Sequence, residues 1–148
     1  QRTKQSLDSK VRESVEQTLK RIEEGGDKVV RELSATFDKF SPESFRLSQA
    51  EIDALVREVP EDQLEAIRFT LEQVRNFAKA QRATLQDLEI QTLPGVTLGH
   101  KHIPMNAVGC YIPGGRYPML ASAIMSVATA KVGGVKRVIA ATPPKDGK

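Results

Sequence analysis

Residues 108–142 read VGCYIPGGRYPMLASAIMSVATAKVGGVKRVIAAT, and this stretch decides the fold of the chain. It holds a short apolar run, a Pro-Gly-Gly loop, a helix-length run of small and apolar residues from about Met119, a Gly133-Gly134 pair and a second apolar run. That order predicts a strand, a loop, a helix and a second strand, which together form one βαβ unit. Because the apolar strands do not alternate, we expect a parallel sheet that is covered on both faces.

The composition indicates a globular protein of 148 residues with few aromatic side chains and a small net charge of +3. Acidic and basic residues are interspersed, so the charge pattern gives little support to nucleic-acid binding. A single cysteine, Cys110, excludes an internal disulfide. No apolar run reaches membrane-spanning length and residues 1–20 are too charged for a signal peptide, so we expect a cytoplasmic protein without membrane contact.

Residues 6–37 carry apolar side chains at three- and four-residue spacing, which predicts two amphipathic helices. The first should end at Gly25-Gly26, since glycine supplies the conformations that a helix exit needs. Asp27 is the expected cap of the second helix, in which Ser34 is predicted to be exposed. The residues expected on the buried faces are Leu7, Val11, Val15, Leu19, Ile22, Val30, Leu33 and Phe37.

Two further helices are predicted between residues 48 and 82. Ser48 and Glu51 have the spacing of a capping box, in which each residue satisfies a backbone amide of the other. Pro60 suits the first position of the next helix, whose exposed side is predicted to be a solvated, charged face. The residues expected to face inward are Ile52, Leu55, Val56, Val59, Leu64, Ile67, Leu71, Val74 and Phe77.

After residue 87 the pattern changes to alternation around a Pro94-Gly95 turn, which predicts a β-hairpin. The alternating residues are Leu88, Ile90, Thr92, Val96, Leu98, His100 and His102. The two histidines are two residues apart and should point the same way on a strand. A metal site needs three or four ligands, and no Cys, Asp or Glu is expected nearby, so a polar surface is favoured over a metal site.

These patterns predict an α/β fold in three segments. Residues 1–85 form a helical N-terminal segment, residues 86–107 a β-hairpin linker, and residues 108–148 the start of an incomplete Rossmann-like parallel-sheet domain. A sheet of two parallel strands cannot bury both faces by itself. We therefore expect that a longer polypeptide, or a partner, completes the sheet.

The loop of residues 113–118 is the predicted binding element. Loops at the carboxyl ends of parallel strands bind ligands in open α/β folds, and glycines let a phosphate approach the backbone. The sequence matches neither G-x-G-x-x-G nor G-x-x-x-x-G-K-[ST], so neither nucleotide fingerprint applies. A tight turn with two rigid prolines is the alternative. Arg116 is a natural partner for a carboxylate, phosphate or sulfonate.

Two neighbouring residues before the loop should face opposite ways. Tyr111 offers a ring and a hydroxyl to a cofactor, although a tyrosine in a strand can equally belong to the core. Cys110 should lie on the other side as a small buried hydrophobe. No His or Asp is placed beside it by the sequence, so a thiolate nucleophile is not expected.

Three segments resemble the histidinol dehydrogenase family. The run VGCYIPGGRYPMLASAIMSVATAKVGGVKRVIAATPP is similar to the opening of that family's nucleotide-binding half, where V-G-x-Y-[IV]-P-G-G leads into a helix ending A-K-V-A-G-V. GDKVVRELSATFDKF (residues 26–40) and LSQAEIDAL (residues 47–55) resemble the family's N-terminal segments. The resemblance thus spans nearly the whole chain in the right order.

The resemblance implies a homodimeric, zinc-containing and NAD-dependent enzyme that oxidises a primary alcohol through an aldehyde to a carboxylate. Within it, the helical segment 1–85 would be the dimer arm. Tyr111 matches the tyrosine that contacts NAD, beside the loop residues Pro113, Gly114 and Gly115. The family's zinc ligands, catalytic Glu-His pair and most substrate contacts lie in later segments. Hence no catalytic or metal residue is assigned in this chain, which alone is expected to be inactive.

The sequence departs from the histidinol enzymes after Pro-Gly-Gly, where it reads RYPMLAS over residues 116–122. With LGHKHIP over residues 98–104, this resembles the branch that acts on 2,3-dihydroxypropane-1-sulfonate. Arg116 would suit that anion, whereas L-histidinol, the alternative substrate, carries a cationic amine. Arg116 could instead serve the pyrophosphate of NAD. Alternatives outside enzymes are an anionic-metabolite-binding α/β module and a helical oligomerisation domain.

Overall fold

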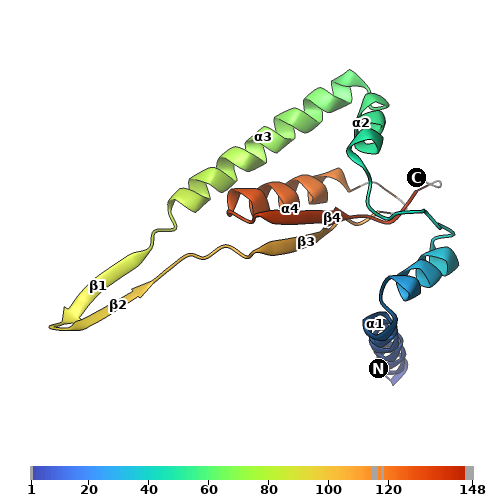
Figure 1. The fold of residues 1–148 in the computed structure, drawn as a ribbon, viewed down its shortest axis with the longest axis horizontal. Coiled ribbons are helices and arrows are strands. Elements are labelled where there is room, and N and C mark those ends of the chain that lie inside the picture. The colour runs from blue at the N-terminus through green and yellow to red at the C-terminus, as the bar shows by residue number, and fades with distance from the viewer. Residues whose placement is uncertain (1, 115–116, 118, 146–148) are drawn as a thin grey trace. The chain divides into compact units, whose positions relative to one another are not determined.

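A computed structural model describes residues 2–114, 117 and 119–145. The chain divides into two compact units, of which the first extends up to Arg46 and the second covers Leu47–Lys145. The boundary between them falls inside the predicted helical segment 1–85. The elements of both units are labelled in Figure 1.

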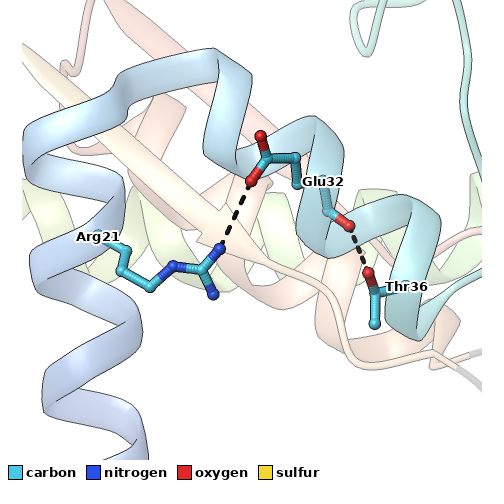
Figure 2. A network of polar contacts seen from close by, with 3 residues as sticks. All are labelled: Arg21, Glu32 and Thr36. Atoms are coloured by element: carbon cyan, nitrogen blue, oxygen red, sulfur yellow. Dashed lines mark hydrogen bonds and ion pairs between the residues drawn. The ribbon is translucent and has the colours of Figure 1, made fainter.

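The first unit is built around α1 (Arg2–Phe37), which is interrupted at Gly26. Gly26 has φ 57° and ψ −143°, a conformation that glycine adopts without the steric penalty of a side chain. The predicted break between two helices is therefore present as a kink. Arg21 reaches across it toward Glu32, with 3.5 Å between Nη2 and Oε2, while the Thr36 hydroxyl donates to the Glu32 carbonyl (Figure 2).

The prediction that Ser34 is exposed was wrong, because the segment after α1 folds back over it. Ser34 is 8% exposed, and its Oγ donates to the Phe40 carbonyl at 2.8 Å. Arg31 holds the same segment by donating to the carbonyls of Pro42 and Glu43. Phe37, which was expected to be buried, is 74% exposed because the returning segment covers the Ser34 side of the helix instead.

The second unit begins with two helices whose starts were predicted closely. α2 (Gln49–Arg57) has the expected capping box: the Glu51 amide donates to Ser48 Oγ, and the Ser48 amide donates to Glu51 Oε2 at 2.7 Å. The hydrogen bond from the Ser48 side chain, and then that from its backbone, lower the pKa of Glu51 below its ordinary value. α3 (Glu61–Ala83) places Pro60 at its N-cap, one position before the one predicted.

The predicted hairpin is formed by β1 (Leu88–Leu93) and β2 (Val96–His100), which pair antiparallel. Its turn contains Gly95 at φ 81°, where a side chain would be strained. The strand ends at His100, so the expectation that His102 continues the alternation on the strand was wrong.

The predicted βαβ unit is confirmed by β3 (Ala107–Tyr111), α4 (Leu120–Val132) and β4 (Arg137–Ala141). The strands pair in parallel, with Ala107 opposite Arg137 and Tyr111 opposite Ala141. Gly133 caps α4, and Gly134 at φ 91° turns the chain toward β4, as the glycine pair indicated.

The core of the second unit lies between α4 and the strand pair. α4 packs on both strands on one side and on α3 on the other (Figure 1). The buried apolar residues of this unit are Cys110 of β3, Ala128 of α4 and Ala78 of α3. The opposite face of the strand pair is open among the described residues, so the expected cover on both faces is present on one face only.

Candidate functional site

The candidate site lies where β3 and β4 end. Beyond β3, the Ile112 amide donates to the Ala141 carbonyl at 2.8 Å, so the pairing continues one step past the strand. Pro113 and Gly114 follow and are both exposed. Of the other predicted loop residues, Gly115, Arg116 and Pro118 lie outside the described residues. The structure thus describes the first part of the predicted loop and its attachment to the sheet.

Gly114 lies directly against the segment that follows β4. A Cβ atom built on Gly114 would be 2.8 Å from Cγ and 3.1 Å from Cδ of Pro143, and 3.2 Å from Oγ1 of Thr142. Real Cβ atoms do not approach other carbon atoms to 2.8 Å. The loops after the two parallel strands therefore touch at a point where only glycine fits without displacement of its neighbours. Thr142 and Pro143 were not among the predicted site residues.

Tyr111 and Cys110 face opposite ways, as predicted. Tyr111 is 70% exposed on the open face of the strand pair, and Cys110 is 6% exposed under α4. Tyr111 therefore lies outside the core of the second unit. Its ring and hydroxyl are available beside Pro113 and Gly114, at the carboxyl edge of the strands.

The histidines of the hairpin lie close together, with ring centroids 5.1 Å apart. His100 Nε2 is 3.1 Å from the Gln86 carbonyl, and the His102 amide donates to Asp87 Oδ1 at 2.9 Å. The prediction of no acidic neighbour was wrong, because strand pairing brings Asp87 to the hairpin end. In the described part of the chain, no group of three or more His, Cys, Asp or Glu side chains is placed to hold a metal ion.

A groove between α3 and α4 was missed by the sequence analysis. It has a volume of about 680 Å³, and three cationic residues, Arg75, Lys79 and Lys131, line it together with apolar side chains. The charged face of α3 was predicted to be only a solvated surface. Arg75 and Lys79 on α3 instead lie beside apolar residues of α4. The signal in the sequence is the four-residue spacing of Leu71, Arg75 and Lys79, which places the three on one side of the helix.

Within the described residues, no helix combines the length and the apolar character that crossing a membrane requires.

Comparison with known proteins identifies relatives over the whole chain. The model of the histidinol dehydrogenase family matches residues 1–148. A histidinol dehydrogenase homolog from Shouchella clausii is 58% identical over 139 residues, which are 94% of this chain and 33% of that protein. Sulfopropanediol 3-dehydrogenase from Ruegeria pomeroyi is 48% identical over 145 residues, which are 98% of this chain and 33% of that protein.

The fold has a match among solved structures. Histidinol dehydrogenase from Elizabethkingia anophelis superimposes with a TM-score of 0.81 at 26% sequence identity, over 93% of this chain and 31% of that one. The match confirms the predicted α/β fold class. The chain spans about a third of the length of the relatives that it matches.

Proposed function

The chain belongs to the histidinol dehydrogenase family, and on that premise we propose that it is the N-terminal third of an NAD- and zinc-dependent alcohol dehydrogenase. The full-length enzyme would oxidise a primary alcohol through an aldehyde to a carboxylate. The observation that carries the proposal is the match of the family over all 148 residues, together with the open loop edge at the end of the βαβ unit.

The described residues at this edge fit NAD. Tyr111 presents an exposed ring and hydroxyl at the carboxyl end of β3. Gly114 has no side chain between its backbone and a ligand, and a Cβ atom at this position would meet the ring of Pro143. When bound, NAD would accept the hydride from the alcohol. Tyr111 would then hold one surface of the cofactor, while Pro113, Gly114 and Gly115 would bring backbone close to it.

Zinc does not fit the described residues, which contain no group of three or more candidate ligands. Zinc sites in enzymes take three protein ligands and leave one position for substrate. We therefore propose that the zinc ligands and the catalytic residues come from parts of the full-length polypeptide outside this chain. No catalytic step is assigned to residues 1–148.

The substrate that we propose is 2,3-dihydroxypropane-1-sulfonate, with L-histidinol as the second candidate. The sequence is 48% identical over 145 residues to the sulfopropanediol enzyme of Ruegeria pomeroyi and 36% identical over 137 residues to the histidinol dehydrogenase of Bacteroides fragilis. Arg116, in the loop after β3, supplies a fixed cation that is complementary to a sulfonate and repels the amine of histidinol.

We also propose that the enzyme is a cytoplasmic homodimer in which the helical segment 1–85 is the dimer arm. Val11, Val15 and Leu19 form an apolar stripe on α1, and each of these side chains is more than half exposed. Such a stripe is normally covered in an assembled protein. Under this proposal, sedimentation of the full-length enzyme should show a dimer. A monomer would contradict the proposal.

The test of the function is a comparison of the two alcohols with the purified full-length enzyme, NAD and zinc. We expect a kcat/KM for the sulfonated diol at least tenfold above that for L-histidinol, since a charge match at the loop discriminates by about 1.4 kcal/mol or more. A preference for histidinol would overturn the substrate. The absence of NAD reduction with both alcohols would count against both substrates.

A further inference from the structure

We propose that Pro143, on the loop after β4, is a positioning residue for the cofactor loop after β3, and that it acts through Gly114. This inference rests on the proposed NAD-binding role of that loop. It adds a residue from the loop after the second strand of the βαβ unit to a site that the sequence placed after the first strand alone.

The geometry that carries this proposal is a contact between two loops held at fixed starting points. The strands pair in register up to Tyr111 and Ala141, and the Ile112 amide still donates to the Ala141 carbonyl. Both loops therefore leave the sheet at the same level. On the β3 side, Pro113 follows the hydrogen-bonded Ile112. The next residue, Gly114, lies against Pro143 of the other loop.

The two neighbours of Gly114, Thr142 and Pro143, differ in how far their side chains can move. The Thr142 hydroxyl lies 3.2 Å from a Cβ built on Gly114, and rotation about χ1 can move it away. The Pro143 ring lies 2.8 Å from that position and cannot rotate, because its carbons are closed onto the backbone nitrogen. The ring is also half-buried, whereas Gly114 is exposed. The rigid side of the contact is therefore Pro143.

If a larger side chain at position 114 forces the two loops apart, we expect the loop after β3 to move. Pro113 and Gly114 are exposed, while the pairing of β3 with β4 is fixed by backbone hydrogen bonds. Gly114 does not have a positive φ, so the backbone itself accepts alanine there. A methyl group on residue 114 would push the cofactor loop away from Pro143 without opening the sheet.

The test is a pair of substitutions in the full-length enzyme, with NAD affinity measured by calorimetry in the absence of alcohol. We expect Gly114→Ala to raise the Kd for NAD about tenfold, which is the scale of an overpacked contact. Pro143→Ala alone removes the ring carbons against which Gly114 lies and should also raise the Kd for NAD, whereas in the double variant the new methyl group fills the space that Cγ and Cδ leave. The double variant Gly114→Ala/Pro143→Ala should therefore bind NAD within about threefold of the wild type.

Pro144→Ala is the matched control, since it makes the same change one residue further on and Pro144 is not among the close neighbours of Gly114. Gly114→Ala/Pro144→Ala should bind NAD as weakly as Gly114→Ala alone. Thermal unfolding of the apo enzymes separates positioning from structure. A Gly114→Ala variant with a lowered Tm and an unchanged Kd would overturn the inference.

The remaining outcomes also decide the matter. If the double variant binds no better than Gly114→Ala, Pro143 does not position the loop. If Gly114→Ala fails to fold, a folded, NAD-binding double variant supports the inference and an unfolded one overturns it. Wild-type enzyme that binds no NAD would refute the proposed function itself, and the inference with it.

Discussion

Tyr111 and Ala141 lie opposite each other at the last paired position of the two parallel strands, β3 and β4. The side chain of Tyr111 is exposed on the open face, whereas its neighbour Cys110 is buried under α4. The loops that begin at this pair meet at Gly114 and Pro143. The described part of the proposed NAD site is therefore a strand end, an exposed aromatic ring and two loops in contact.

Tyr111 should contribute to NAD affinity chiefly through its ring. We expect Tyr111→Ala in the full-length enzyme to raise the KM for NAD about tenfold, since loss of a stacked ring costs about 1–2 kcal/mol. Tyr111→Phe keeps the ring and should change the KM by less than about threefold. Steady-state kinetics with varied NAD provides the measurement. An unchanged KM in Tyr111→Ala would remove Tyr111 from the cofactor site.

Cys110 should be inert in the native protein because α4 covers it. A thiol-specific reagent should label Cys110 only after unfolding, as measured by mass spectrometry of the peptide that contains it. Rapid labelling of the native enzyme at Cys110 would contradict the packing of α4 on β3. Cys110→Ala should preserve the KM for NAD, because the residue faces away from Tyr111.

Arg116 should separate the substrates by charge. We expect Arg116→Ala to raise the KM for the sulfonated diol about tenfold or more while the KM for NAD stays unchanged, because only the sulfonate loses its cation. Arg116→Lys keeps the charge and should recover part of the loss. The opposite result, a raised KM for NAD and an unchanged KM for the diol, would assign Arg116 to the pyrophosphate of the cofactor.

Ser34 should stabilise the end of α1 through its hydrogen bond to Phe40. Ser34→Ala leaves a carbonyl without its donor, which costs about 1 kcal/mol of unfolding free energy. Denaturant unfolding of the full-length protein provides the measurement. Ser41→Ala is the control, because Ser41 is exposed and its change should fall within about 0.5 kcal/mol of the wild type. Equal effects of the two substitutions would contradict the buried role of Ser34.

The capping box of α2 should make Glu51 titrate below 4.5, its ordinary pKa, because Ser48 donates hydrogen bonds to the charged carboxylate. A lowered pKa in the folded state means that the box contributes stability above pH 4.5 and loses it as the pH falls through the folded pKa. The carboxyl resonance of Glu51, followed by NMR, gives the midpoint. Ser48→Ala should move that midpoint up toward 4.5, whereas a wild-type midpoint at or above 4.5 would contradict the box.

The sequence predicted those features that depend on neighbouring residues. The βαβ unit follows from two apolar runs, the loop glycines and Gly133-Gly134, and the start of α2 follows from Ser48 and Glu51. Each of these signals is complete within a few residues. The opposite orientations of Cys110 and Tyr111 follow in the same way, because alternation is a property of any strand.

The features that were missed depend on segments that meet in space. Ser34 is buried by the chain that returns after α1, and Asp87 reaches His102 through the pairing of the hairpin. Pro143 meets Gly114 only because β3 and β4 are parallel and in register. No local pattern predicts these contacts. The groove between α3 and α4 was missed for the same reason: Arg75 and Lys79 lie beside apolar residues of α4 only because the two helices pack together.

The most direct measurement of the central claim is the stoichiometry of NADH formation by the full-length enzyme with a limiting amount of 2,3-dihydroxypropane-1-sulfonate. The account predicts two NADH per molecule of diol and a carboxylate as the final product, since two hydride transfers convert the alcohol to the acid. No NADH from this diol, or one NADH with the aldehyde accumulating, would contradict it.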